Sequence, residues 1–211
     1  MAVTDHQRVE WSDALRSNLE PLTSLHGIVQ DRVERQKAIG NALAKALELV
    51  ERERSEAAGA LSQLSEASED AVRRARLVGV KLEMAFLEGD ITEDAYRATL
   101  AAAFPAGSQS VGATPALRYD ALKRIVSALV QFPGADPGGK LGELAHAGAK
   151  AIEDANLAAK REQEETQAAQ EALSNARVEF DRAYQATKEI MSGLLRDAGR
   201  LDELRDIFPD M

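Results

Sequence analysis

The sequence contains no cysteine among its 211 residues. This absence excludes disulfide bonds and thiolate metal sites. Aromatic residues make up only 4% of the chain, although 45% of its residues are hydrophobic. A core that is poor in rings and rich in alanine favours helices that lie close together. Runs of β-branched residues with a period of two are also missing, so we expect an all-α protein.

Long apolar runs and a surplus of basic charge are absent as well. Nowhere do roughly 18 apolar residues run together, as a transmembrane helix requires, and residues 1–11 contain no apolar core of signal-peptide length. The formal net charge of −9 disfavours nucleic acid and anionic membranes as partners, because both bind clustered lysine and arginine. We therefore expect a soluble, cytoplasmic and acidic protein.

What the sequence does contain is a long repeat of apolar and small residues in alternating steps of four and three. This spacing is typical of a coiled coil, in which one face of a helix packs against a partner helix. The repeat predicts a long helix over residues 141–198. Its series is Leu141, Ala145, Gly148, Ile152, Ala155, Ala159, Glu162, Thr166, Ala169, Leu173, Ala176, Phe180, Ala183, Thr187, Ile190 and Leu194.

A second heptad series predicts the partner helix over residues 37–87. The series drifts around the helix, as happens when a helix of 3.6 residues per turn is not fully supercoiled. We expect the two long helices to pack antiparallel in an elongated helical bundle. The main row of this second series is Leu43, Val50, Ala57, Leu64, Ala71, Val78 and Ala85.

Shorter helices accompany the first long helix. In a first half, residues 1–105, a medium helix precedes the long one, and a short helix follows over residues 93–103. The chain is expected to turn or bend near residues 30–37. Residues 106–115 are rich in glycine and serine and form a linker.

The second half, residues 116–211, repeats this order with a medium helix, the long helix and a short helix over 201–207. The shared order suggests an internal duplication, and a chance alignment of two alanine-rich amphipathic helices explains it equally well. We expect both halves to form one folded unit. Because the predicted seam consists largely of alanine and buries little apolar surface per layer, a homodimer is a reasonable hypothesis.

Motifs for chemistry are sparse. Helical-bundle metal centres use a Glu-x-x-His pair from each of two helices, and only one such pair exists, Glu143 and His146. The sequence shows neither a nucleotide-binding glycine loop nor a serine–histidine motif of nucleophilic catalysis. We expect no metal, no cofactor, no small-molecule substrate and no catalytic residue.

Three polar residues occupy seam positions near the middle of the long helices: Glu53, Glu162 and Thr166. One interpretation is that this polar region faces water and keeps the helices soluble. The other is that these residues fix the register or the choice of partner, as a buried polar seam residue can.

The functional expectation is a non-enzymatic helical bundle that serves as a structural, scaffold or protein-interaction module, with a protein or a second copy as partner. An alternative is a helical secreted toxin or translocated effector. Its best apolar stretch, Leu77–Leu87, is short for bilayer entry and contains Lys81 and Glu83. A carboxylate-metal helical-bundle enzyme is a third class, for which a second ligand pair is missing.

Overall fold

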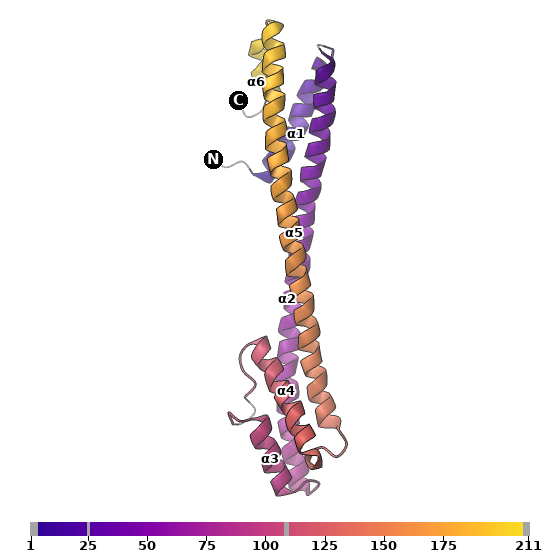
Figure 1. Cartoon of the computed structure of the whole chain (residues 1–211), viewed down its shortest axis with the longest axis vertical. Coiled ribbons are helices and arrows are strands. Elements are labelled where there is room, and N and C mark those ends of the chain that lie inside the picture. Colours follow the sequence, from indigo (N-terminus) through magenta and orange to yellow (C-terminus); the bar gives the residue numbers. More distant parts are fainter. Residues whose placement is uncertain (1–3, 25, 108–109, 209–211) are drawn as a thin grey trace. The chain divides into compact units, whose positions relative to one another are not determined.

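The structure of the protein is a computed structural model that describes residues 4–24, 26–107 and 110–208. Within these residues the chain forms six α helices, joined by turns and short 3-10 helices, and no strand. Two helices, α2 (Gly27–Glu88) and α5 (Lys140–Asp197), are far longer than the others (Figure 1). The structure confirms the prediction of an all-α bundle built on two long packed helices.

The chain divides into two compact units, and both long helices contribute a segment to each. The first unit comprises Met1–Ser55 and Glu164–Met211, and the second comprises Glu56–Gln163. Antiparallel pairing brings the beginning of α2 beside the end of α5, so each unit is built from segments distant in sequence. These units therefore do not coincide with the two sequential halves expected from the sequence, whose duplication stays a prediction.

Three shorter helices begin at threonine caps. The Thr4 hydroxyl accepts the backbone N–H of Gln7, and the Gln7 side chain accepts that of Thr4, which forms a capping box. Thr92 and Thr114 cap their helices with one such bond each. The three helices are α1 (Asp5–Leu19), α3 (Glu93–Ala103) and α4 (Pro115–Gln131).

Helix α2 begins ten residues before the predicted start, so the expected turn near residues 30–37 is wrong. The chain turns earlier, in a 3-10 helix (Glu20–Leu22) that contains Pro21. The His26 Nδ1 atom then accepts the backbone N–H of Ile28 at 3.1 Å. The His26 side chain therefore caps α2, and Gly27 is the first residue of this helix.

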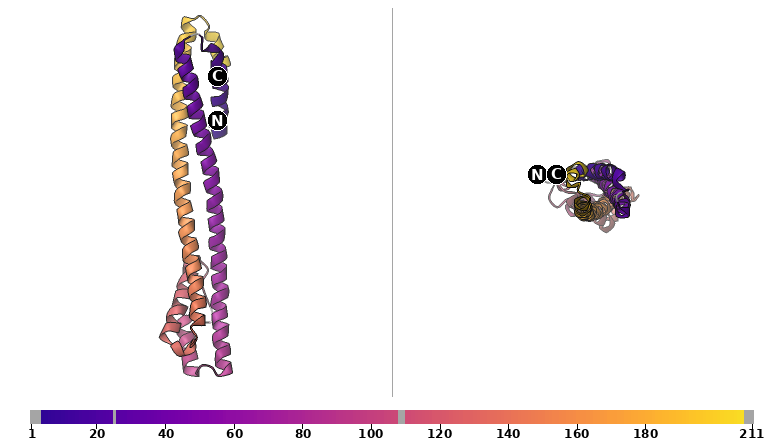
Figure 2. Two further views of the ribbon diagram at one scale, coloured as in Figure 1. Left: turned by 90° about the vertical axis from the view of Figure 1, so that its right-hand side faces the viewer. Right: turned by 90° about the horizontal axis from the view of Figure 1, so that it is seen from above.

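The first unit packs α1 and the short C-terminal helix α6 (Leu204–Ile207) around the paired long helices. The Asn18 side-chain amide donates to the backbone carbonyls of Asp206 and Ile207, at 3.0 and 3.1 Å. This contact holds α6 against the end of α1 (Figure 2). The fully buried centre of the core contains Leu15, Leu19, Val29, Leu43, Met191 and Leu195.

Helices α1 and α2 approach closely where Gly40 faces Ser12. The Ser12 hydroxyl donates to the Gln36 carbonyl at 3.1 Å and accepts from the Gln36 amide at 3.3 Å. A Cβ atom at residue 40 would overlap the hydroxyl oxygen of Ser12. Only glycine therefore permits this approach without a shift of the helices.

The second unit buries one face of α2 against α3, α4 and the first part of α5. Phe86 and Tyr96 stack with ring centroids 4.8 Å apart, and Gly148 lets Leu122 and Arg74 approach α5. In the turn before α5, the Asp136 carboxylate accepts two N–H groups of the first turn of that helix. The fully buried side chains of this core are Ala71, Ala75, Val78, Leu82, Leu122, Ile125 and Ala145.

The predicted seams lie where the sequence places them. Every residue of the α5 series from Leu141 to Leu194 is buried or half-buried, and so is every residue of the main α2 row. Near its C-terminal end the α5 seam moves by one residue, so that Met191 and Leu195 are fully buried while Ile190 and Leu194 are half-buried. This shift follows from the mismatch between 3.6 residues per turn and a repeat of 3.5.

Candidate functional site

An exposed apolar stripe on α2 is the main candidate site. Leu77, Val80, Met84 and Leu87 are 43%, 44%, 51% and 75% exposed, and they follow one another in steps of three, four and three. Residues at this spacing share one face of a helix. The stripe thus has the pattern of a coiled-coil seam, yet within the described residues it is open to solvent.

The stripe lies on the face of α2 opposite the core of its own unit. Ala75, Val78 and Leu82 from the same turns are fully buried. At about 100° per residue, the centre of the stripe is turned roughly 170° from the centre of this buried row. This part of α2 therefore has two apolar faces, and only one of them is covered in its unit.

Exposed charges flank the stripe in an ordered way. Arg76 and Lys81 come first along the helix, and Glu83 and Glu88 follow. These four exposed side chains border the apolar residues on both sides, as charges border the seam of a coiled coil. The border changes from basic to acidic along the helix.

The sequence contains the signal for this stripe, because the three-four-three spacing can be read directly from residues 77–87. The neighbouring core row has the same period, and periodicity alone does not tell which of two apolar rows is buried.

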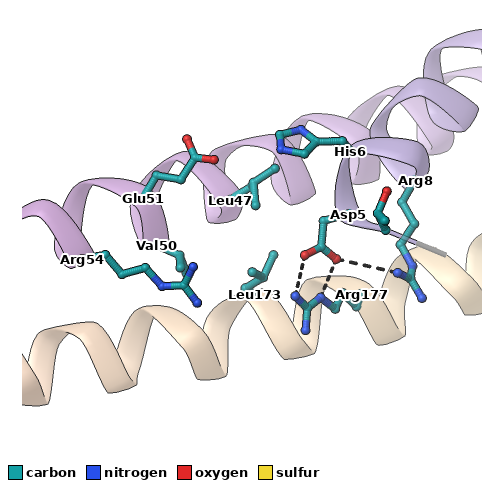
Figure 3. Close-up of a pocket in the computed structure, with 10 residues that line it drawn as sticks. Asp5, His6, Arg8, Leu47, Val50, Glu51, Arg54, Leu173 and Arg177 are labelled. Atoms are coloured by element: carbon teal, nitrogen blue, oxygen red, sulfur yellow. Dashed lines mark hydrogen bonds and ion pairs between the residues drawn. The ribbon is translucent and has the colours of Figure 1, made fainter. Parts of the chain in front are cut away.

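A pocket of about 580 Å³ lies in the first unit, where the start of α1 meets α2 and α5. Figure 3 shows the Asp5 carboxylate directed at the Arg177 guanidinium on α5. Arg177 donates to both oxygens of Asp5, with Nε to Oδ1 at 2.6 Å. The lining comprises Thr4, Asp5, His6, Arg8, Leu47, Val50, Glu51, Arg54, Leu173 and Arg177.

The charges in this pocket stabilise one another. The hydrogen bonds from Arg177 hold the pKa of Asp5 below its usual value, against the opposing effect of its burial. The same pair raises the pKa of Arg177. Arg8 lies 3.7 Å from Asp5 and donates to Asp181 at 3.0 Å. These contacts hold the first turn of α1 against α5. The Asp5–Arg177 ion pair across the pocket is therefore best explained as a structural contact between the two helices.

Two of the three predicted seam residues, Glu53 and Thr166, belong to the first unit and contact each other. The Thr166 hydroxyl donates to the Glu53 carbonyl at 3.3 Å. The Glu53 side chain is 4% exposed, and one of its oxygens accepts from Arg52 at 2.6 Å. Glu162 is half-buried and belongs to the second unit. Whether these residues set register stays a prediction.

The Glu-x-x-His pair does not face the core. Both Glu143 and His146 are exposed, on the first turns of α5. They border a shallow pocket with Val126, Leu129 and Val130 of α4. The pair thus lies on the polar side of α5, away from the inward position that a bundle metal centre uses.

No protein-family model, curated protein or solved structure matches this chain. Among the helices that the structure describes, none is both long enough and apolar enough to cross a membrane. Functional inference therefore depends on the geometry of the chain itself.

Proposed function

We propose that the chain is a non-enzymatic helical bundle that acts as a protein-interaction module, and that the stripe Leu77–Val80–Met84–Leu87 is its docking face. The observation that supports this proposal is the stripe itself. Four large apolar side chains at heptad spacing are exposed on one helix face. A contiguous exposed apolar patch bordered by polar residues is typical of an interaction site.

A helix is the partner that this face fits best. The stripe offers a straight row of side chains along about three turns, and knobs-into-holes packing needs the same spacing on both helices. The opposite face of α2 is already packed in the core, which holds the docking face on a rigid element.

Photo-cross-linking in the native cell tests this proposal. A photoreactive amino acid replaces Val80 in the full chain, and a matched control carries it at Ser62, an exposed polar position on the same side of α2 about five turns earlier. We expect covalent protein adducts from residue 80 and a much lower yield from residue 62. Equal or absent adducts at both positions would overturn the proposed docking face.

A further inference from the structure

We propose that the stripe binds the same stripe of a second copy of this chain, with the two α2 helices antiparallel. This inference rests on the proposed docking face and identifies its occupant. It follows from the order of charges beside the apolar residues. In heptad positions, Leu77 and Met84 take position a and Val80 and Leu87 take position d, so that Arg76 and Glu83 occupy g and Lys81 and Glu88 occupy e.

A parallel pair of these helices places like charges together. In parallel coiled coils, position g of one helix faces position e of the next heptad on the other. Arg76 would then face Lys81, and Glu83 would face Glu88. Each contact occurs twice in a symmetric pair, so four like-charge contacts oppose parallel association.

An antiparallel pair places the basic end of one segment beside the acidic end of the other. In an antiparallel pair, position e of one helix faces position e of the other, and g faces g. With the two-fold axis near residue 82, Lys81 therefore approaches the partner's Glu88 on one side of the seam, and Arg76 and the partner's Glu83 share the other side. Like charges then meet only beside the axis, where Lys81 and Glu83 each approach their own copy. The charge order therefore favours the antiparallel arrangement.

The same axis aligns the apolar residues in complete layers. Leu77 of one copy packs beside Leu87 of the other, and Val80 packs beside Met84. Two-fold symmetry generates each layer twice, so all four stripe residues are covered on both copies. An a position thus meets a d position in every layer, which is the arrangement of an antiparallel seam.

The size of the stripe sets the expected affinity. A typical stable interface buries about 800 Å² on each partner, and three turns of one helix bury less than this. We therefore expect reversible association in the micromolar range, and no permanent dimer.

Disulfide trapping tests both the partner and the orientation, because the natural chain has no cysteine. Two full-length variants are made, Leu77→Cys and Leu87→Cys, one of them carrying a mass tag. Each residue lies five positions from the proposed axis, so either cysteine is displaced from its own copy by about 15 Å along the helix. In a mixed pair the two cysteines share a layer, close to the separation that a disulfide needs.

We expect the mixture to form a tagged–untagged disulfide dimer under mild oxidation, while each variant alone stays largely monomeric. Addition of Val80→Glu to both chains should reduce the trapped dimer at least tenfold without loss of helical circular dichroism, since residue 80 is exposed. A mixture of tagged and untagged Ser62→Cys chains gives the background yield of disulfide dimer that random collision produces.

Two results would overturn the inference. Efficient disulfide formation by each variant alone would indicate parallel pairing. A mixture that gives no more dimer than Ser62→Cys, together with a monomer in sedimentation at millimolar concentration, would exclude a second copy. In that last case, adducts with a different protein in the photo-cross-linking experiment would still support the docking face, so the two proposals fail separately.

Discussion

Replacement of Glu53 by leucine is expected to stabilise the protein. Glu53 is 4% exposed, and Arg52 donates to its Oε1 atom at 2.6 Å. Its Oε2 atom is buried and has no hydrogen-bond partner among the described residues. The Glu53→Leu variant removes this unsatisfied acceptor and keeps the bond from Thr166, which goes to the backbone carbonyl.

The expected gain is up to about 3 kcal/mol in the free energy of unfolding. Leaving a buried acceptor unsatisfied costs about 1–3 kcal/mol, and leucine keeps apolar carbons buried where the aliphatic part of Glu53 lies. Against these gains stands the loss of the Arg52 ion pair. The Arg52 side chain is 64% exposed, so this pair contributes about 0–1 kcal/mol.

Urea unfolding followed by circular dichroism measures the effect. Glu48→Leu is the matched control, since Glu48 is exposed one and a half turns earlier on α2, and a change there should stay within about 0.5 kcal/mol. A Glu53→Leu protein that is less stable than the natural one would refute the reasoning, because the carboxylate would then be stabilising. A rise in stability with broadened α5 resonances would further support a role in register.

Three further predictions concern the remaining contacts. Gly40→Ala should destabilise the first unit by about 1–3 kcal/mol in urea unfolding, and a second change, Ser12→Gly, should restore much of that loss. Because Arg177 lowers the pKa of Asp5, this pair stabilises the protein above the unfolded pKa near 3.8 and loses its effect as pH falls through the lowered folded value. Asp5→Asn should therefore be less stable than the natural chain at neutral pH, with a difference that shrinks in acid. Glu162→Leu should raise the melting temperature by a few degrees and loosen oligomer specificity, and unchanged melting with an unchanged oligomer would remove that hypothesis.

Local signals predicted most of the helix ends. A helix-start signal needs only residues within one turn, so the starts of α3 at Thr92 and of α4 at Pro115 could be predicted from the sequence. The seam of α5 was predictable for the same reason, because a heptad repeat describes one helix. The start of α2 was not predicted, because glycine has a low helix propensity and Gly27 was not expected to begin a helix. The turn at Pro21 and the hydrogen bond that His26 accepts make Gly27 the first residue of the helix.

Contacts between distant segments could not be predicted. Asp5 and Arg177 are 172 residues apart, and no periodicity relates them. The make-up of the compact units depends on the same kind of long-range pairing, since each unit joins segments of α2 and α5. The docking stripe is a different case, because its spacing is visible. Its exposure depends on which face α3, α4 and α5 cover, and a single sequence does not state that.

The central claim is that the stripe on α2 binds a second copy, and methionine methyl NMR on the unaltered protein tests it most directly. Met84 is half exposed within the stripe, whereas Met191 is fully buried in the other unit and serves as an internal control. On concentration from the low micromolar to the millimolar range, the Met84 methyl resonance should shift and saturate while that of Met191 stays fixed. A Met84 resonance that keeps its position over the whole range would contradict the account.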